Sequence, residues 1–106
     1  MKKSYILYTC NSEKAIKRVL PYLVDNLDDE NEQIVIVDDL SEDGTIPFAV
    51  GCVGYNWANE EHYKLYINTK KEGKRKSIKK AMKIASGEEK VVIDMRRRLV
   101  WYKLAI

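Results

Sequence analysis

Two adjacent carboxylates follow a short apolar run in the segment QIVIVDDLSEDGT, residues 33–45. Residues 34–37 are an unbroken β-branched run, which is typical of a strand covered on both faces. Asp38 and Asp39 come directly after this run. A carboxylate in this position can accept hydrogen bonds from the hydroxyls of a ribose or from an N–H group of a base. The segment therefore predicts a nucleoside-binding position at the end of a strand.

Two other interpretations of this segment remain open. Asp, Ser and Gly are ordinary turn formers, so the two acids could simply mark a solvated strand end. Asp43 and Gly44 could also form the turn of a β-hairpin between residues 34–37 and 48–53. The hairpin would place the two aspartates between antiparallel strands. The nucleoside hypothesis instead needs a neighbouring parallel strand whose carboxyl end lies at the same edge of the sheet.

Residues 4–9 (SYILYT) supply the candidate for that neighbouring strand. Thr9 ends this strand, and the next residues, Asn11 among them, are N-cap types that predict the start of a helix. A strand, a helix and a strand with this spacing form a right-handed unit whose strands are parallel. Ligands bind beyond the carboxyl ends of such strands, and a helix N-terminus favours an anion. We therefore expect Thr9, Asn11, Asp38 and Asp39 around one nucleotide.

The remaining elements complete an α/β pattern. Pro21 lies inside the first helix and should kink or break it. Residues 46–55 (IPFAVGCVGY) are expected to be extended or irregular, because they contain two glycines and several valines. A second helix over 74–86 with Gly87 as its C-cap is predicted between strands at 63–68 and 91–94. With a last strand at 99–106, the fold class is a single layered domain over 1–106, with a mostly parallel Rossmann-like sheet, two main helices and a C-terminal strand pair.

Composition sets further limits on the class of protein. The 106 residues are 45% hydrophobic and 33% charged, which fits one folded domain with a single core. No apolar run is long enough for a membrane span, and no signal peptide is recognisable at the start. Cys10 and Cys52 are isolated in the sequence, which favours reduced thiols in a cytoplasmic protein over a zinc site.

Three blocks of the sequence together resemble a known family. YTCNSEKAIKRVLPYLVDNL, IVIVDDLSEDGT and GKRKSIKKAMKIASGEEKVVIDM are similar to the N-terminal, nucleotide-binding half of the inverting GT-A glycosyltransferases of family 2. The resemblance implies that Asp38 and Asp39 contact the nucleoside of a nucleotide-sugar. It also implies that Asp94 is the first carboxylate of a D-x-D motif, which in that family holds a divalent metal on the diphosphate.

The chain departs from the family pattern at two places. Arg96 stands where the second aspartate of D-x-D belongs, and an arginine repels a divalent cation but can pair directly with a diphosphate. Residues 46–55 lack the helical pattern that the family shows after D-G-T. We also expect no counterpart of the family's acceptor-binding half or of its catalytic base within these 106 residues. We therefore expect nucleotide or nucleotide-sugar binding without sugar transfer by this chain alone.

A second hypothesis comes from the uneven distribution of charge. Residues 25–43 carry nine acids and no base, whereas residues 70–83 carry eight bases and one acid. A basic helix face of this kind is either a solvated surface or a phosphate-binding surface. The alternative function is a small basic interaction protein that binds nucleic acid or a host protein through Lys76, Lys79, Lys80, Lys83 and Arg97. An exposed edge strand at 99–106 would also favour dimerisation.

Overall fold

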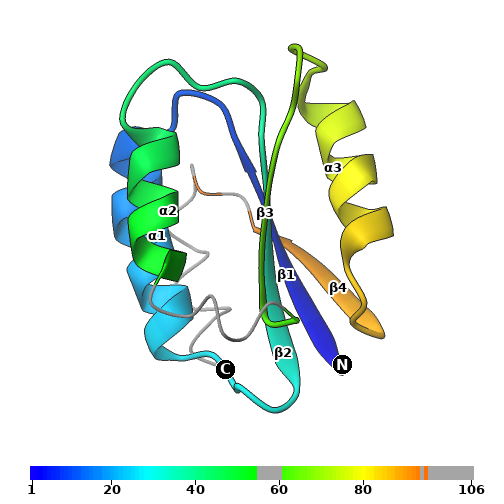
Figure 1. The fold of residues 1–106 in the computed structure, drawn as a ribbon. Helices are drawn as coiled ribbons and strands as arrows, with labels where there is room; N and C mark the ends of the chain where they lie inside the picture. Colours follow the sequence, from blue (N-terminus) through cyan, green and yellow to red (C-terminus); the bar gives the residue numbers. More distant parts are fainter. Residues whose placement is uncertain (55–60, 94, 96–106) are drawn as a thin grey trace.

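The computed structural model describes residues 1–54, 61–93 and 95. Four strands and three helices alternate along this part of the chain (Figure 1). Their bounds are β1 Lys3–Thr9, α1 Glu13–Asp25, β2 Glu32–Asp38, α2 Thr45–Gly54, β3 Tyr63–Ile67, α3 Lys74–Ile84 and β4 Glu89–Ile93. The predicted strand at 99–106 lies outside the described residues.

The strands form one parallel sheet with the order β3-β2-β1-β4. Helices α1 and α2 cover one face and α3 covers the other, while the connections that follow β1, β2 and β3 all lie at the same end of the molecule (Figure 1). The register pairs Thr9 with Asp38, and Asp38 with Ile67. The predicted layered α/β fold with a parallel sheet is therefore confirmed. The β-hairpin alternative is wrong, because β2 pairs with parallel strands on both sides.

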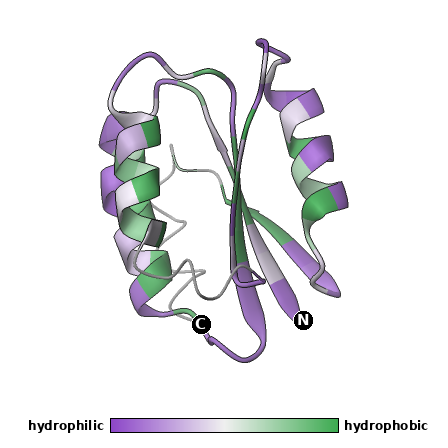
Figure 2. Ribbon diagram, viewed as in Figure 1, coloured by the Kyte–Doolittle hydropathy of each residue, from purple (hydrophilic) through white to green (hydrophobic). Residues whose placement is uncertain are grey.

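The core divides into two layers, one on each face of the sheet. On the face of α1 and α2, fully buried residues such as Leu7, Leu20 and Ile36 form the larger cluster. On the face of α3, Ile6 and Val35 are buried among the apolar residues of that helix. All three helices turn their apolar sides toward the sheet (Figure 2). Both faces of β2 are thus covered, as the unbroken apolar run predicts.

Helix α2 corrects the prediction of an extended segment at 46–55. The Asp43 carboxylate accepts hydrogen bonds from the Thr45 amide (3.0 Å) and hydroxyl, so it satisfies donors at the start of the helix. Pro47 lies in the first turn, where a missing N–H breaks no helical hydrogen bond. Thr45, Ala49 and Val53, spaced four residues apart, are buried on one face. Burial of that face outweighs the low helix propensity of glycine and valine.

Two further expectations about helices need correction. Helix α1 runs unbroken through Pro21 to Asp25, so the predicted break into two helices is wrong, whereas the alternative of a kink at Pro21 stays a prediction. Helix α3 ends at Ile84 with Ala85 as its C-cap, which leaves Gly87 outside the helix. Gly87 lies instead against β1, where its amide donates to the Ser4 hydroxyl at 2.8 Å. A Cβ at position 87 would lie 2.5 Å from the Ser4 backbone nitrogen. The glycine therefore allows the chain to approach the sheet closely.

We predict that Gly87→Ala lowers the free energy of unfolding by about 1–3 kcal/mol, because the methyl group must displace the backbone of β1. Urea denaturation of the two proteins measures this difference. Gly51→Ala is the matched control, since Gly51 is exposed in α2 with nothing within 4 Å of an added Cβ. We expect this control to raise stability by about 0.4–1 kcal/mol. Equal stability of the wild type and Gly87→Ala would contradict the role assigned to Gly87.

None of the helices in the described part of the chain combines the length and the apolar character that crossing a bilayer requires.

Candidate functional site

The ends of β1 and β2 lie side by side, as the nucleoside hypothesis requires. The Thr9 hydroxyl donates to Asp38 Oδ1 at 2.6 Å, and the Asp39 amide donates to the Thr9 carbonyl at 2.8 Å. Asp38 is only 1% exposed, and it also accepts hydrogen bonds from the Ser41 amide and hydroxyl. The carboxylate of Asp38 therefore joins the two strand ends to the turn that follows β2.

Asp39 is 2% exposed and its carboxylate is fully engaged inside the protein. Oδ1 accepts from the Asn68 side chain (3.0 Å) and the Glu72 amide (2.8 Å). Oδ2 accepts from the Gly73 amide (3.0 Å) and the Tyr8 hydroxyl (3.2 Å). Burial alone raises the pKa of this carboxyl, but these four hydrogen bonds outweigh burial and hold the pKa below its ordinary value. Asp39 is thus an ionised carboxylate that accepts hydrogen bonds in the interior of the protein.

Asn68 is a member of the site that the sequence analysis did not single out. It follows the end of β3, and its amide donates to the Asp38 carbonyl at 2.8 Å. Its side chain is 1% exposed and joins Asp39 to the Ser77 hydroxyl of α3 at 3.0 Å. The signal was available, because Asn68 is the polar residue that ends the strand predicted at 63–68, as Thr9 ends the strand predicted at 4–9.

Lys80 takes part in the same network. Its ammonium group donates to Asn68 Oδ1 at 2.8 Å and pairs with Glu72 at 2.5 Å. It also lies over the Tyr66 ring, 4.6 Å from the centroid. Lys80 is half-buried, whereas Lys76, Lys79 and Lys83 are exposed on the outer face of α3. The four lysines proposed for nucleic acid therefore do not form one free surface.

Asn11 is exposed at the rim and holds the turn after β2. Its backbone is left-handed, with φ 49°, a conformation that asparagine adopts more readily than most residues. Its amide donates to the Ser41 hydroxyl at 2.8 Å, and its Oδ1 accepts from the Glu42 amide at 2.7 Å. Asn11 therefore lies next to the predicted acids and orders the loop that carries them.

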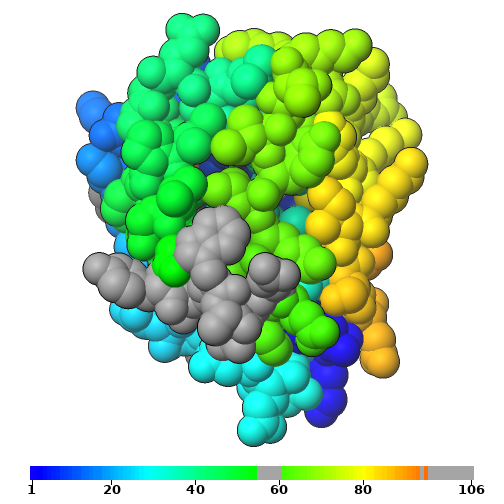
Figure 3. All heavy atoms as spheres, in the orientation of Figure 1, coloured from blue at the N-terminus to red at the C-terminus, as the bar shows by residue number. Residues whose placement is uncertain are grey.

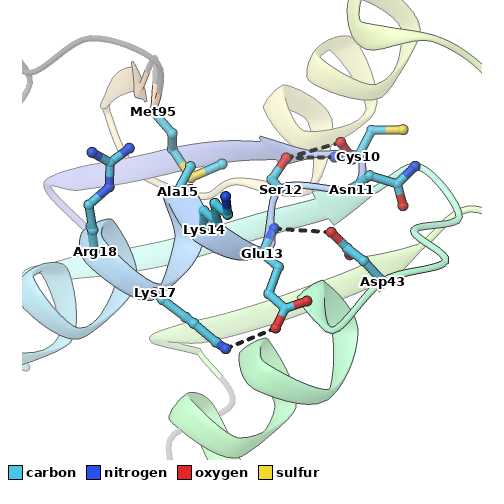
Figure 4. Close-up of a pocket in the computed structure, with 10 residues that line it drawn as sticks. All are labelled: Cys10, Asn11, Ser12, Glu13, Lys14, Ala15, Lys17, Arg18, Asp43 and Met95. Atoms are coloured by element: carbon cyan, nitrogen blue, oxygen red, sulfur yellow. Dashed lines mark hydrogen bonds and ion pairs between the residues drawn. The ribbon is translucent and has the colours of Figure 1, made fainter.

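A cavity of about 760 Å³ opens at the start of α1. It is lined by residues 10–15, Lys17, Arg18, Asp43 and Met95 (Figure 4). The helix amides at its head are partly engaged, since Ser12 N donates to Thr45 and Glu13 N donates to Asp43. Lys17 is paired with Glu13 at 2.8 Å, whereas Lys14 and Arg18 have no acidic partner within the described residues.

A smaller cavity of about 200 Å³ lies between β1, β4 and α3. It shares Cys10, Ser12, Ala15 and Met95 with the larger cavity, and it also contacts Tyr8, Lys74, Ile78, Val92 and Ile93. Lys71 reaches the shared corner, with its ammonium group 3.6 Å from Cys10 Sγ. The two cavities therefore adjoin at the carboxyl ends of β1 and β4, and together they are called the hollow below, with Lys14 and Arg18 at one cavity and Lys74 at the other.

Asp94, Arg96 and Arg97 lie outside the described residues, so their assigned roles stay predictions. Among the residues that the structure does describe, no three His, Cys, Asp or Glu side chains lie close enough to hold a metal ion.

A parallel sheet with helices on both faces and polar residues at the carboxyl ends of its strands has the architecture of the doubly wound α/β domains, which bind ligands at that edge. The family model for glycosyl transferase family 2 matches residues 4–95, and the chain belongs to this family. The fold and the family thus agree with the resemblance carried by the three sequence blocks.

Solved structures of the same class align over most of the chain. TarS 1-349 from S. aureus in complex with UDP-GlcNAc is 28% identical over 99% of this chain and 30% of that chain, with a TM-score of 0.73. TarS 1-349 in complex with UDP is 31% identical over 90% of this chain and 27% of that chain, with a TM-score of 0.71. The mannosyltransferase PcManGT from Pyrobaculum calidifontis in complex with GDP-Man and Mn²⁺ is 27% identical over 82% of this chain and 25% of that chain, with a TM-score of 0.67.

The chain therefore spans less than a third of the length of the aligned chain in each of these three structures. No curated protein matches the chain significantly.

Proposed function

We propose that this chain binds a nucleotide-sugar as the donor-binding part of a glycosyltransferase. On its own, this part is not expected to transfer the sugar. The observation that carries the proposal is the parallel register of Thr9 with Asp38, which brings the two polar strand ends to one edge beside the hollow at the start of α1. Membership of glycosyl transferase family 2 and neighbours in complex with UDP, UDP-GlcNAc or GDP-Man support it.

Cationic side chains, more than helix amides, are suited to hold the diphosphate. The amide of the N-cap residue Ser12 and the first amide of α1, that of Glu13, already donate to Thr45 and Asp43. Lys14 and Arg18 line the large cavity without an acidic partner in the described part of the chain. Charge-assisted hydrogen bonds from such groups are strong contacts for phosphate oxygens. We assign the diphosphate to these two residues, together with Arg96, which follows the cavity residue Met95 in the sequence.

The proposed site works without a divalent cation. The second acid of D-x-D is replaced by Arg96. A fixed guanidinium group can neutralise a diphosphate in place of a metal ion. Asp94 alone is too small a ligand set, because divalent cations on phosphates are held by several oxygen ligands.

We predict that UDP or GDP compounds raise the melting temperature of the protein, and that adding Mn²⁺ or EDTA leaves the rise unchanged. A ligand that binds only the folded state stabilises it by mass action. A thermal-shift screen of nucleotides and nucleotide-sugars, run with and without metal, checks both parts. A shift that appears only with Mn²⁺ would contradict the role given to Arg96, and no shift with any nucleotide would contradict the proposed function.

Among the described residues, no specific observation favours the alternative function of a basic interaction protein. Lys80 is engaged inside the protein, and the exposed Lys76, Lys79 and Lys83 are the solvated side of an amphipathic helix.

A further inference from the structure

Strand β3 is one of the two edge strands of the sheet, and its inner side pairs with β2. Among the described residues, no strand pairs with its outer side. His62 and Asn68, which flank β3, both form backbone hydrogen bonds to β2. Successive residues of a strand direct their backbone groups to opposite sides. Tyr63, Leu65 and Ile67 therefore direct their N–H and C=O groups toward the outer edge.

Exposed apolar side chains gather along this edge. Tyr66 and Ile67 of β3 are 41% and 39% exposed, and Val50 of α2 is 39% exposed. Phe48 is on the side of α2 that faces α1, because Lys17 of α1 lies 6.0 Å from its ring centroid. Val50 follows Phe48 by two residues, so it is on the opposite side of α2, away from α1. Helix α2 contacts β3, and Figure 3 shows the atoms of both next to each other on one face.

The same edge carries very little charge. Helix α2 and strand β3 together have one charged side chain, Lys64, although 33% of the whole chain is charged. A solvated surface normally carries interspersed charges of both signs, whereas charged residues are depleted at the centre of protein–protein interfaces. An edge strand with exposed apolar side chains is also a template for pairing with another strand. The composition of this edge is therefore that of an interface.

The sequence of β3 is complementary to itself in one antiparallel register. When Leu65 lies opposite Leu65 of a second copy, the outward residues of both strands face one another and exchange ladder hydrogen bonds. Lys64 then lies opposite Tyr66 of the second copy, which is a favourable cation–π pair. Sliding one strand by two residues would place Lys64 opposite Lys64, and like charges in that position are destabilising. Lys64 thus selects the register centred on Leu65.

We propose that this chain forms a two-fold symmetric homodimer in which the β3 strands of two copies pair antiparallel about Leu65. The two four-stranded sheets then become one continuous sheet, with the uncharged helix α2 of each copy beside the two-fold axis. The assignment goes beyond the proposed function and does not depend on it. Because the contact is one short strand and one side of a helix, we expect a dissociation constant of about 10–100 µM.

The wild-type protein tests the pairing directly. Analytical ultracentrifugation between about 10 µM and 1 mM should show the mass rise from that of one chain toward that of two. Amide hydrogen exchange should identify the surface. The outward amides of Tyr63, Leu65 and Ile67 are expected to exchange at least about threefold more slowly at the higher concentration, because dimerisation protects them by mass action. The amides of Lys64 and Tyr66, which are directed toward β2, should exchange alike at both concentrations.

Tyr66→Lys tests the register, because it places a lysine opposite Lys64 of the second copy. We expect it to raise the dissociation constant at least about tenfold. Adding Lys64→Glu to this variant should restore dimerisation, since a glutamate then faces the new lysine. Val92→Lys is the matched control, because Val92 is a similarly exposed apolar residue (43%) on the other edge strand, β4. This control is expected to dimerise like the wild type.

The mass of a single chain at every concentration would overturn the proposal. A dimer in which the outward β3 amides exchange equally fast at both concentrations would also overturn it, because another surface would then form the contact. The same conclusion would follow if Tyr66→Lys dimerised like the wild type or if Val92→Lys lost the dimer. Failure of Lys64→Glu to restore the dimer would contradict the register about Leu65. None of these measurements uses a nucleotide, so they stand apart from the test of the proposed function.

Discussion

Replacing Lys14 and Arg18 together with alanine is expected to lower the affinity for a nucleoside diphosphate about 100-fold. Each charge-assisted hydrogen bond to a phosphate oxygen contributes about 1.5–3 kcal/mol, and 1.4 kcal/mol corresponds to a factor of ten. Both side chains line the large cavity without an acidic partner in the described residues (Figure 4). Both are exposed, so their removal should leave the fold intact. Isothermal titration with UDP and GDP measures the loss.

The matched control for this variant is Lys76→Ala combined with Lys79→Ala, which removes the same net charge from the exposed face of α3. Helix α3 packs on β1 and β2, on the opposite face of the sheet from α1 (Figures 1 and 3). We expect this control to bind nucleotides like the wild type at physiological salt. An equal loss in both double variants would show that only net charge matters and would contradict a localised diphosphate site.

Asp39→Ala is expected to lower the free energy of unfolding by about 2–4 kcal/mol near neutral pH. The change leaves the Asn68 side chain and the Glu72 and Gly73 amides without their buried acceptor, and unsatisfied buried donors are costly. Chemical denaturation measures the difference. A loss below about 0.5 kcal/mol would show that water replaces the carboxylate and would contradict its structural role.

Asp39 also makes the free energy of unfolding depend on pH. The folded pKa of Asp39 is below its ordinary value of 3.8, because the four hydrogen bonds outweigh burial. The stabilisation is therefore fully present above about pH 4, where the unfolded carboxyl is also ionised, and it is lost as the pH falls through the lower folded pKa. The wild type should thus lose part of its advantage over Asp39→Ala in acid. An advantage that grows below pH 4 would contradict the lowered pKa.

The sequence predicts most of the sheet because its signals are local. The β-branched run at 34–37 and the alternation of strand and helix are enough to predict parallel strands, and parallel strands bring Thr9 beside Asp38. Helix α2 is missed for a physical reason. Its residues are apolar on nearly every side, so they show no helical periodicity, and the cap from Asp43 is the only local sign of where it begins.

The candidate site is predicted less completely than the fold. Strand ends indicate which polar residues meet, but they do not show whether a carboxylate faces a ligand or the interior. Asp39 is used internally because the connection after β3 returns over it, and this return depends on contacts between residues more than 30 positions apart. Lys80 follows the spacing of a solvated helix face, yet Glu72 and Asn68 draw it inward. Long-range pairing of this kind has no signature in a single sequence.

The central claim is that a nucleotide binds at the edge formed by the ends of β1 and β2 and the start of α1. Amide chemical shifts of the labelled protein, recorded by NMR during titrations with UDP-GlcNAc and GDP-mannose, test it most directly. We predict that at least one ligand changes the chemical shifts of amides within residues 9–18 and 70–74. The chemical shifts of the exposed α3 residues Lys76, Lys79 and Lys83 should stay unchanged. The absence of any shift at millimolar ligand, or shifts confined to the exposed lysine face, would contradict the account.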